Sequence, residues 1–276
     1  MNVRDLTEDD RVPGVRFDPT YLRRAKAGGM YVGLVAEDGG HVYGAAEAGI
    51  LLHTTRGPAL RTRFISSRVS QTFRPLLETM CDRARDLGCK ALYVMSAPHA
   101  PELCTAAMIM KFARINGDFS MSRRNVPTEA VEIPGVIIRA MHVDEYPEVR
   151  RRLISLVSGG DRSVSAPELR QFLASGLFVP YVAEVDGELV ACAELDVFHT
   201  VLANCRVGRV ERVAVHPDWR GRGISRALVA ELLRQSSLLG CEKVDLLVRD
   251  GNVPAIRTYD RLGFVRTNEI PYWLAL

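Results

Sequence analysis

Several features are missing from this chain of 276 residues, and each absence excludes a class of protein. No run of 18 consecutive apolar residues occurs, so we expect no membrane-spanning helix and no membrane partner. The opening sequence, MNVRDLTEDD, has no apolar core, which argues against a secretory signal. The six cysteines form no C-x-x-C pair and no zinc-like spacing. We therefore expect reduced thiols, mostly buried, in a cytoplasmic protein.

An excess of charge and clustered histidines are also lacking. The formal net charge of +3 is too small to indicate a nucleic-acid partner by itself, and it suits a protein that binds an anionic ligand equally well. The six histidines show no H-x-x-x-H spacing and no grouping with cysteine, so no metal is expected. Apolar residues make up 47% of the chain and charged residues 25%, as in ordinary globular proteins. The length suits two domains with a core each.

The most informative segment that is present is a glycine-rich turn between a strand and a helix. An alternating apolar run over 207–215 predicts the strand, and the HPD sequence after it predicts the turn. From Ile224 onward, apolar side chains recur every three or four residues, which predicts the helix. Free N–H groups at a helix start attract anions, and glycines allow the backbone to approach them closely. With positive charge added by Arg220, Arg222 and Arg226, the segment predicts a phosphate-binding site.

Two motifs indicate which phosphate compound binds. The turn lacks the G-x-x-x-x-G-K-[ST] of a nucleotide P-loop, and a dinucleotide G-x-G-x-x-G would need a glycine at position 226. Instead, RGRGIS, from Arg220 to Ser225, resembles the [QR]-x-x-G-x-[GA] signature of the GCN5-related N-acetyltransferases (the GNAT superfamily), with Ser225 at the last position. Downstream, NVPAIRTYDRLGF, from Asn252 to Phe264, resembles the family's N-x-x-A-x-x-x-Y-x-x-x-G-F. The resemblance covers residues 136–276.

This resemblance implies acetyl-CoA as co-substrate and no metal. Main-chain groups of the strand would pair with the pantetheine arm and stabilise the oxyanion, and the turn would hold the pyrophosphate. The cofactor-binding residues expected on this basis are Val213, Ala214, Val215, Arg220, Gly221, Arg222, Gly223, Ile224, Ser225 and Asn252. Asn252 would contact the cofactor through its side-chain amide. An asparagine shortly before Pro254 would also cap the helix that follows, and the two roles are compatible.

The same motifs suggest an acid and a base for acyl transfer. Tyr259 is the candidate acid, because a phenol is protonated at neutral pH and can donate to a leaving thiolate. Glu211 is the candidate base, and alternation along the strand would place it on the same face as Val213 and Val215. A glutamate with a pKa near 4.3 is a poor direct base for an ammonium group, so a water relay is expected. Two alternatives remain open. In the first, Glu211 forms a surface ion pair with Arg209 or Arg212. In the second, the base is Glu194, Asp196 or His199.

The chain also repeats itself, which predicts a tandem duplication. Leu87-Gly88-Cys89 recurs 152 residues later as Leu239-Gly240-Cys241. At slightly smaller offsets, strand pairs that turn through Asp-Gly recur as well. The other matched segments are Phe112, Arg114 and Asn116 with Phe264, Arg266 and Asn268; Tyr31-Val32 with Tyr181-Val182; Ala45-Ala46-Glu47 with Cys192-Ala193-Glu194; and Val3-Arg4-Asp5-Leu6 with Ile138-Arg139-Ala140-Met141.

The fold class expected is α+β (mixed α/β), with two tandem GNAT (acyl-CoA N-acyltransferase) domains. The resemblance implies that each has a mixed, mostly antiparallel sheet that splays where the long helix begins. We expect a degenerate GNAT-like domain over residues 1–128 and an acetyl-CoA-binding catalytic domain over 129–276, joined by a linker within 126–135. A shift of 152 places Val69 and Gln71 on the two glycines of the turn and Ala107 on Tyr259. The first domain therefore lacks the chemistry, and it either shapes the acceptor site or stabilises its partner.

The predicted function is an N-acetyltransferase that passes an acetyl group from acetyl-CoA to a primary amine, most simply that of a small molecule. Two alternatives stay open. The first is an aminoacyl-tRNA-dependent amide-forming transferase of similar fold, for which tRNA binding would be salt-sensitive. The second is a non-catalytic CoA-binding module. The sequence does not select the acceptor, the acyl length or the oligomeric state.

Overall fold

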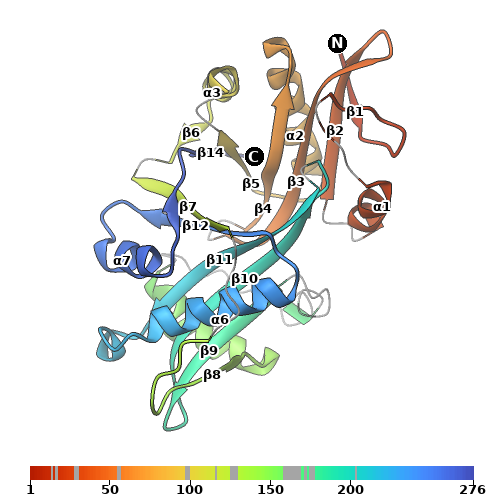
Figure 1. Ribbon diagram of the computed structural model, residues 1–276. Coiled ribbons are helices and arrows are strands. Elements are labelled where there is room, and N and C mark those ends of the chain that lie inside the picture. Colours follow the sequence, from red (N-terminus) through yellow and green to blue (C-terminus); the bar gives the residue numbers. More distant parts are fainter. Residues whose placement is uncertain are drawn as a thin grey trace. The chain divides into compact units, whose positions relative to one another are not determined.

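The computed structural model of this chain divides into two compact units (Figure 1). The first unit comprises Met1–Asp118, His199–Cys205 and Asn268–Leu276, and the second comprises Phe119–Phe198 and Arg206–Thr267. The residues described are 1–13, 15, 18–27, 31–54, 57–96, 100–115, 117–124, 130–157, 169–170, 173, 178–202 and 204–276. Part of the expected linker, 125–129, lies outside this set.

Each unit contains one seven-stranded sheet. The strand order is β1-β2-β3-β4-β5-β14-β6 in the first and β13-β7-β12-β11-β10-β9-β8 in the second. The strands of the first sheet are β1 (Asn2–Asp5), β2 (Tyr31–Asp38), β3 (His41–Thr54), β4 (Gly57–Ser67), β5 (Ala91–Ser96), β6 (Ala113–Arg114) and β14 (Ile270–Ala275). Those of the second are β7 (Asp118–Arg124), β8 (Ile137–Ala140), β9 (Phe178–Val185), β10 (Glu188–Thr200), β11 (Cys205–Val215), β12 (Lys243–Arg249) and β13 (Val265–Arg266).

Helices lie on both faces of each sheet. In the first unit, α1 (Pro19–Ala27) contributes Leu22 to a cluster with Val35 on one face, and α2 (Phe73–Asp86) packs on Leu34 on the other. In the second unit, α4 (Tyr146–Arg152) packs on one face and α6 (Ile224–Leu238) on the other. The remaining described helices are α3 (Pro101–Ile109) and α7 (Val253–Arg261), with short 3-10 turns η1 (Ser70–Thr72), η2 (Val143–Glu145), η3 (Ile154–Leu156) and η4 (Pro217–Trp219). The mixed α+β class predicted from sequence is confirmed.

The two halves exchange their last strands. In sequence order β7 ends the first half, yet it joins the second sheet, where Met121 pairs with Arg266. The C-terminal strand β14 joins the first sheet instead and pairs along β5 from Ile270↔Ser96 to Ala275↔Ala91. The expected division at residues 128 and 129 describes two repeats along the chain, whereas the compact units cross that division. Hydrophobic patterning gives no signal for the exchange, because either partner strand offers an equivalent edge.

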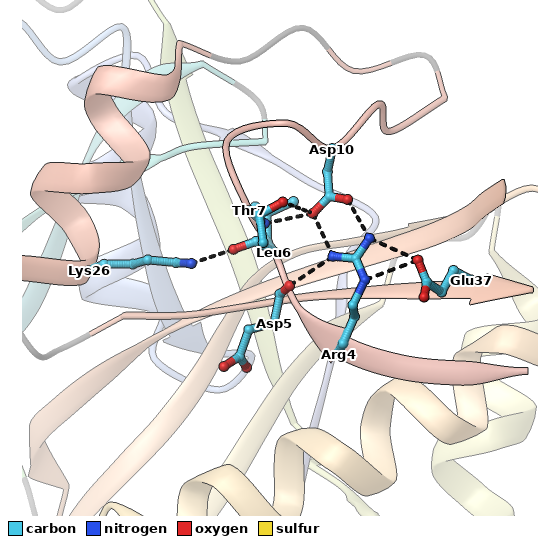
Figure 2. A network of polar contacts seen from close by, with 7 residues as sticks. All are labelled: Arg4, Asp5, Leu6, Thr7, Asp10, Lys26 and Glu37. Atoms are coloured by element: carbon cyan, nitrogen blue, oxygen red, sulfur yellow. Dashed lines mark hydrogen bonds and ion pairs between the residues drawn. The ribbon is translucent and has the colours of Figure 1, made fainter. Parts of the chain in front are cut away.

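The structure supports the duplication through a matching pair of ion-pair networks. Arg4 donates to Asp10 at 2.6 Å and to Glu37 at 2.8 Å, and Asp10 also accepts from Thr7 (Figure 2). In the second half, Arg139 donates to Glu145 at 2.6 Å and to Glu184 at 2.9 Å. Each arginine also bonds the carbonyl of the next residue, at Asp5 and Ala140. In both halves, therefore, one guanidinium ties the first strand of a sheet to the second.

The strand pairing corrects one match of the predicted repeat. Leu6 N–H donates to Gly33 O, and Met141 N–H donates to Pro180 O at the equivalent place. The offset over these strands is therefore 147 residues, as it is for Glu37 and Glu184. Tyr31 corresponds to Phe178, not to Tyr181 as the YV dipeptides suggested. A short identical dipeptide misleads because neighbouring strand positions have similar burial and so accept similar residues.

The long helices of the two repeats end in the same way. Cys89 N–H bonds Ala84 O after α2, and Cys241 N–H bonds Ser236 O after α6, in both cases around a left-handed glycine. All six cysteines are free, and four of them are buried. Within the described residues, no helix is long and apolar enough to cross a membrane.

Candidate active site

The second sheet opens along β11, the strand that leads into the glycine-rich turn at 220–226. The parallel pairing of β11 with β12 runs from Val207↔Lys243 to Val210↔Leu246 and goes no further, although both strands continue. Arg212 has a positive φ of 46°, which is rare for a residue with a side chain and marks an irregularity in β11. The strand pair therefore splays beyond residue 210, as the sequence resemblance implied.

The turn itself has the backbone that its glycines predict. Gly221 and Gly223 have φ of +77° and +81°, in the left-handed region where a side chain is strained. Gly223 is the residue before α6, and the helix starts at Ile224 with Ala227 N–H bonding Gly223 O. A Cβ on Gly221 would meet nothing within 4 Å. The glycine at 221 is therefore required by conformation and by close approach from outside, not by crowding within the protein.

This turn contains main-chain N–H groups that are unpaired among the described residues. The N–H groups of Trp219 and Arg220 are used within the turn, by the carbonyls of His216 and Pro217. Among the described residues, no acceptor is found for the N–H groups of 221 to 226. Donors left unpaired at the start of a helix suit a bound polyanion, which the helix dipole also attracts.

Positive side chains surround these donors. Arg220, Arg222 and Arg226 are exposed. Arg220 is held by a bond from its Nε to Val215 O at 3.1 Å, and the Arg222 guanidinium lies 4.4 Å from the centre of the Trp219 ring. These contacts keep both side chains beside the turn while leaving charge available to solvent. The groups predicted to bind phosphate are thus assembled in one place.

The equivalent turn in the first half is closed. Val69, which matches Gly221, is extended with φ −127°, and Gln71, which matches Gly223, does not have a positive φ. Val69 N–H donates to Ser67 Oγ, and the Thr72 hydroxyl donates to Ser67 Oγ and Val69 O. Thr72 N–H bonds Val69 O. The backbone N–H groups of Val69, Thr72 and Phe73 are thus used within the protein itself.

The two predicted catalytic residues, Tyr259 and Glu211, lie close enough for the charge of Glu211 to affect the pKa of Tyr259. Tyr259 lies on α7, is only 7% exposed, and packs edge-on against Phe264 with ring centres 5.8 Å apart. Burial, and next the negative charge of Glu211, raise the pKa of Tyr259 to about 12. The hydroxyl is therefore a proton donor at neutral pH. Glu211 itself is about one-quarter exposed, and its Oε1 lies 3.8 Å from Arg209 Nη1.

Alternation along β11 is interrupted near Glu211. Val210, Val213 and Val215 all contact the core cluster beneath α6, and strict alternation cannot place residues 210 and 213 on one face. The irregular backbone at Arg212 takes up the extra residue. Simple alternation therefore does not fix the face of Glu211, and its place beside Val213 and Val215 stays a prediction. Ala214 belongs to the opposite cluster, with Val182 and Cys192.

A buried polar group beside Glu211 was only partly foreseen. Glu194, a rival base in the sequence analysis, is 2% exposed and lies 3.0 Å from Arg212 Nη1. Burial, and next the charges of Asp196 and Glu211, raise its pKa well above the usual range. Tyr146 and Arg150 of α4 complete the group, and the sequence analysis missed both. The sequence feature that could have identified them is Arg150, an arginine on the apolar face of an amphipathic helix.

Asn252 occupies the cap position that its sequence context predicts. Its Oδ1 accepts a hydrogen bond from Ala255 N–H at 3.3 Å, at the start of α7. This use of the oxygen leaves the side-chain NH₂ free of the cap. Its contact with a cofactor stays a prediction. Within the described residues, no group of three or more His, Cys, Asp and Glu side chains gathers as metal ligands would.

Comparisons with known proteins agree with this geometry. Residues 144–264 match the family model of the acetyltransferase (GNAT) family. An acetyltransferase of Pectobacterium atrosepticum is 36% identical over 85 residues, which are 30% of this chain and 55% of that protein. One of Sodalis glossinidius is 40% identical over 57 residues, 21% of this chain and 40% of that protein. The chain thus spans about half the length of these curated relatives, or less.

Solved structures share the fold of nearly the whole chain. A tandem GNAT protein from the clavulanic acid biosynthesis pathway aligns with a TM-score of 0.61 at 16% identity, covering 99% of this chain and 98% of that one. A GCN5-related N-acetyltransferase from Sphaerobacter thermophilus aligns at 0.60 and 16%, covering 99% and 95%. These likenesses establish a tandem GNAT fold. The segment that matches the GNAT family model lies in the second half of the chain.

Proposed function

We propose that this protein is an acetyl-CoA-dependent N-acetyltransferase whose acceptor is the primary amine of a small molecule. The observation that carries the proposal is the turn at 220–226, where unpaired N–H groups and exposed arginines lie beside strands that part after Val210. Such a turn suits the pyrophosphate of CoA, and the gap between β11 and β12 suits its pantetheine arm. The family match over residues 144–264 supports the same assignment.

The residues near the gap suit direct transfer. The amine nitrogen attacks the thioester carbonyl, the C–S bond breaks, and the departing thiolate takes the proton of Tyr259. Glu211, partly exposed and near Tyr259, accepts the amine proton through water. Main-chain N–H groups near Val213 would face the developing oxyanion. Localisation in the cytoplasm and the absence of nucleic acid from the reaction belong to the same proposal.

Thiol release from acetyl-CoA, measured across a panel of amines, tests this function. We expect turnover with at least one primary amine, with one thiol and one amide formed per cycle. Binding of CoA without thiol release or amide formation for any amine would favour the non-catalytic alternative. Amide formation only with aminoacyl-tRNA, lost as salt is raised, would favour the tRNA-dependent alternative.

Replacing the candidate acid tests the chemistry. Tyr259→Phe should lower kcat by about 100-fold, within the range for loss of a general acid, while the Kd for CoA changes less than about twofold. Tyr181→Phe is the matched control, because Tyr181 is also a buried tyrosine in the same core cluster. Equal kcat values for the wild type and Tyr259→Phe would remove Tyr259 from the mechanism.

A further inference from the structure

The tip of the β10–β11 hairpin belongs to the first unit, although both strands run on into the second sheet. Residues His199–Cys205 form this tip. Val201 is fully buried and Leu202 is 2% exposed, in an apolar cluster with Leu6, Val12, Leu22, Val35 and Ala45 of the first unit. Asn204 N–H bonds Val201 O, and the Thr200 hydroxyl bonds Cys205 O at 2.9 Å. The tip is thus a closed turn seated in a core.

One carboxylate accepts hydrogen bonds from the main chain of this tip. Glu47, on β3, is fully buried. Its Oε2 accepts hydrogen bonds from Val201 N–H at 2.9 Å and from Leu202 N–H at 3.3 Å. The Tyr31 hydroxyl donates to the same oxygen at 3.2 Å. Without this carboxylate, two buried N–H groups would lose their acceptor, which is costly in a core.

Glu47 is the counterpart of Glu194 in the repeat, since both lie at the offset of 147 residues that the ion-pair networks fix. Glu194 lies on β10 among the buried polar group of the candidate active site and accepts no hydrogen bond from the described residues beyond its ion pair with Arg212. In the second half, the same strand position thus lies in the buried polar group near Glu211. In the first half it is used to hold a segment of the chain's own backbone.

We infer that Glu47 is a positioning residue: it anchors the β10–β11 hairpin at its tip and so keeps in register the two strands that carry Glu194 and Glu211. This gives the first half a role without a ligand of its own, as the receptor for the hairpin. The kinetic consequence rests on the proposed function, and the structural consequence does not.

The test compares the full-length wild type with Glu47→Ala, Glu47→Gln and Glu37→Ala. Glutamine keeps an oxygen acceptor for the two N–H groups, whereas alanine removes it. Glu37 is the matched control, because its carboxylate binds Arg4 in the same sheet (Figure 2). Glu47→Ala should speed amide hydrogen exchange at Val201 and Leu202, and along β10 and β11, by at least about tenfold. Compared at pH 5, below the pKa of Glu47, Glu47→Gln and Glu37→Ala should stay near the wild type.

The kinetic readout separates positioning from general stability. Glu47→Ala should lower kcat by about fivefold with the Kd for CoA unchanged, and Glu47→Gln should restore kcat. Unchanged exchange at Val201 and Leu202, an unchanged kcat, or an equal loss in Glu37→Ala would each overturn the inference. A wild type inactive with every amine would refute the proposed function, and exchange along β10 and β11 would then decide the inference alone.

Discussion

The turns that lead into α2 and α6 hold equivalent places in a repeated fold, yet they use their backbone in opposite ways. Before α6, two left-handed glycines leave a row of N–H groups without acceptors among the described residues. Before α2, Val69 is extended, and the N–H groups of Val69, Thr72 and Phe73 bond Ser67 Oγ and main-chain carbonyls. The sheet still splays in the first half, because β4 and β5 pair only from Ala59↔Ala91 to Arg61↔Tyr93. We therefore expect anion binding to depend on free donors, not on the splay alone.

Two buried glutamates at equivalent positions of the repeats, Glu47 on β3 and Glu194 on β10, show a similar contrast. Glu47 is satisfied by main-chain N–H groups and a tyrosine, whereas Glu194 is paired with Arg212 and faces other carboxylates. The comparison shows that two repeats can keep one fold while the equivalent buried glutamate has different partners in each. Fold likeness alone would not distinguish the two halves.

The largest effect expected is on cofactor binding. Gly223→Glu should weaken CoA binding by at least about 100-fold, or about 2.7 kcal/mol, because a side chain is strained at this φ and a carboxylate repels phosphate. Isothermal calorimetry measures the change. The matched control is Gln71→Glu, at the equivalent position of the closed turn, for which the affinity should stay the same. Equal losses in the two variants would remove the difference between the turns.

A smaller effect is expected on the pH dependence of stability. Burial raises the pKa of Glu47 to about 7, against an ordinary value of 4.5, and the charge of Arg63 and the bond from Tyr31 only partly oppose this. Between these two values the unfolded chain binds fewer protons than the folded one, so Glu47 lowers stability as pH rises. Glu47→Gln should therefore gain on the order of 2 kcal/mol in unfolding free energy relative to the wild type between pH 5 and pH 8.

Denaturant titrations of both proteins across this pH range check the result. The other titrating groups are common to the two proteins and cancel in the difference. A difference in unfolding free energy that stays constant with pH, or falls as pH rises, would contradict the assignment of Glu47.

The smallest effect expected is at the end of the last helix of the first half. Lys111 has φ 62° where the second half has Gly263 at 76°, and each follows its helix in the same hydrogen-bonding pattern. Lys111→Gly should raise the unfolding free energy by about 0.5–1 kcal/mol, because glycine relieves the left-handed strain. Lys111→Ala removes the charge without that relief. An equal gain in both variants would assign the effect to charge.

Much of the local structure followed from sequence patterns. The strand before the turn was expected over 207–215 and is Cys205–Val215, and the helix expected from Ile224 begins there. The Asp-Gly turns of both strand pairs were identified as well, with Asp186 and Gly187 both at positive φ. These features depend on contacts between near neighbours in the chain, so periodicity and turn chemistry report them directly.

What the sequence determined by itself was the repeat and the glycine-rich turn before the long helix, and it predicted Tyr259 and Glu211 as acid and base in the same half. Only the tertiary structure decided the exchange of β7 and β14, the irregularity at Arg212 in β11, and the seating of the hairpin tip on Glu47. Each of these joins residues far apart in the chain or depends on one residue's backbone angle. Hydrophobic patterning is nearly the same for either outcome, so only the packed structure distinguishes them.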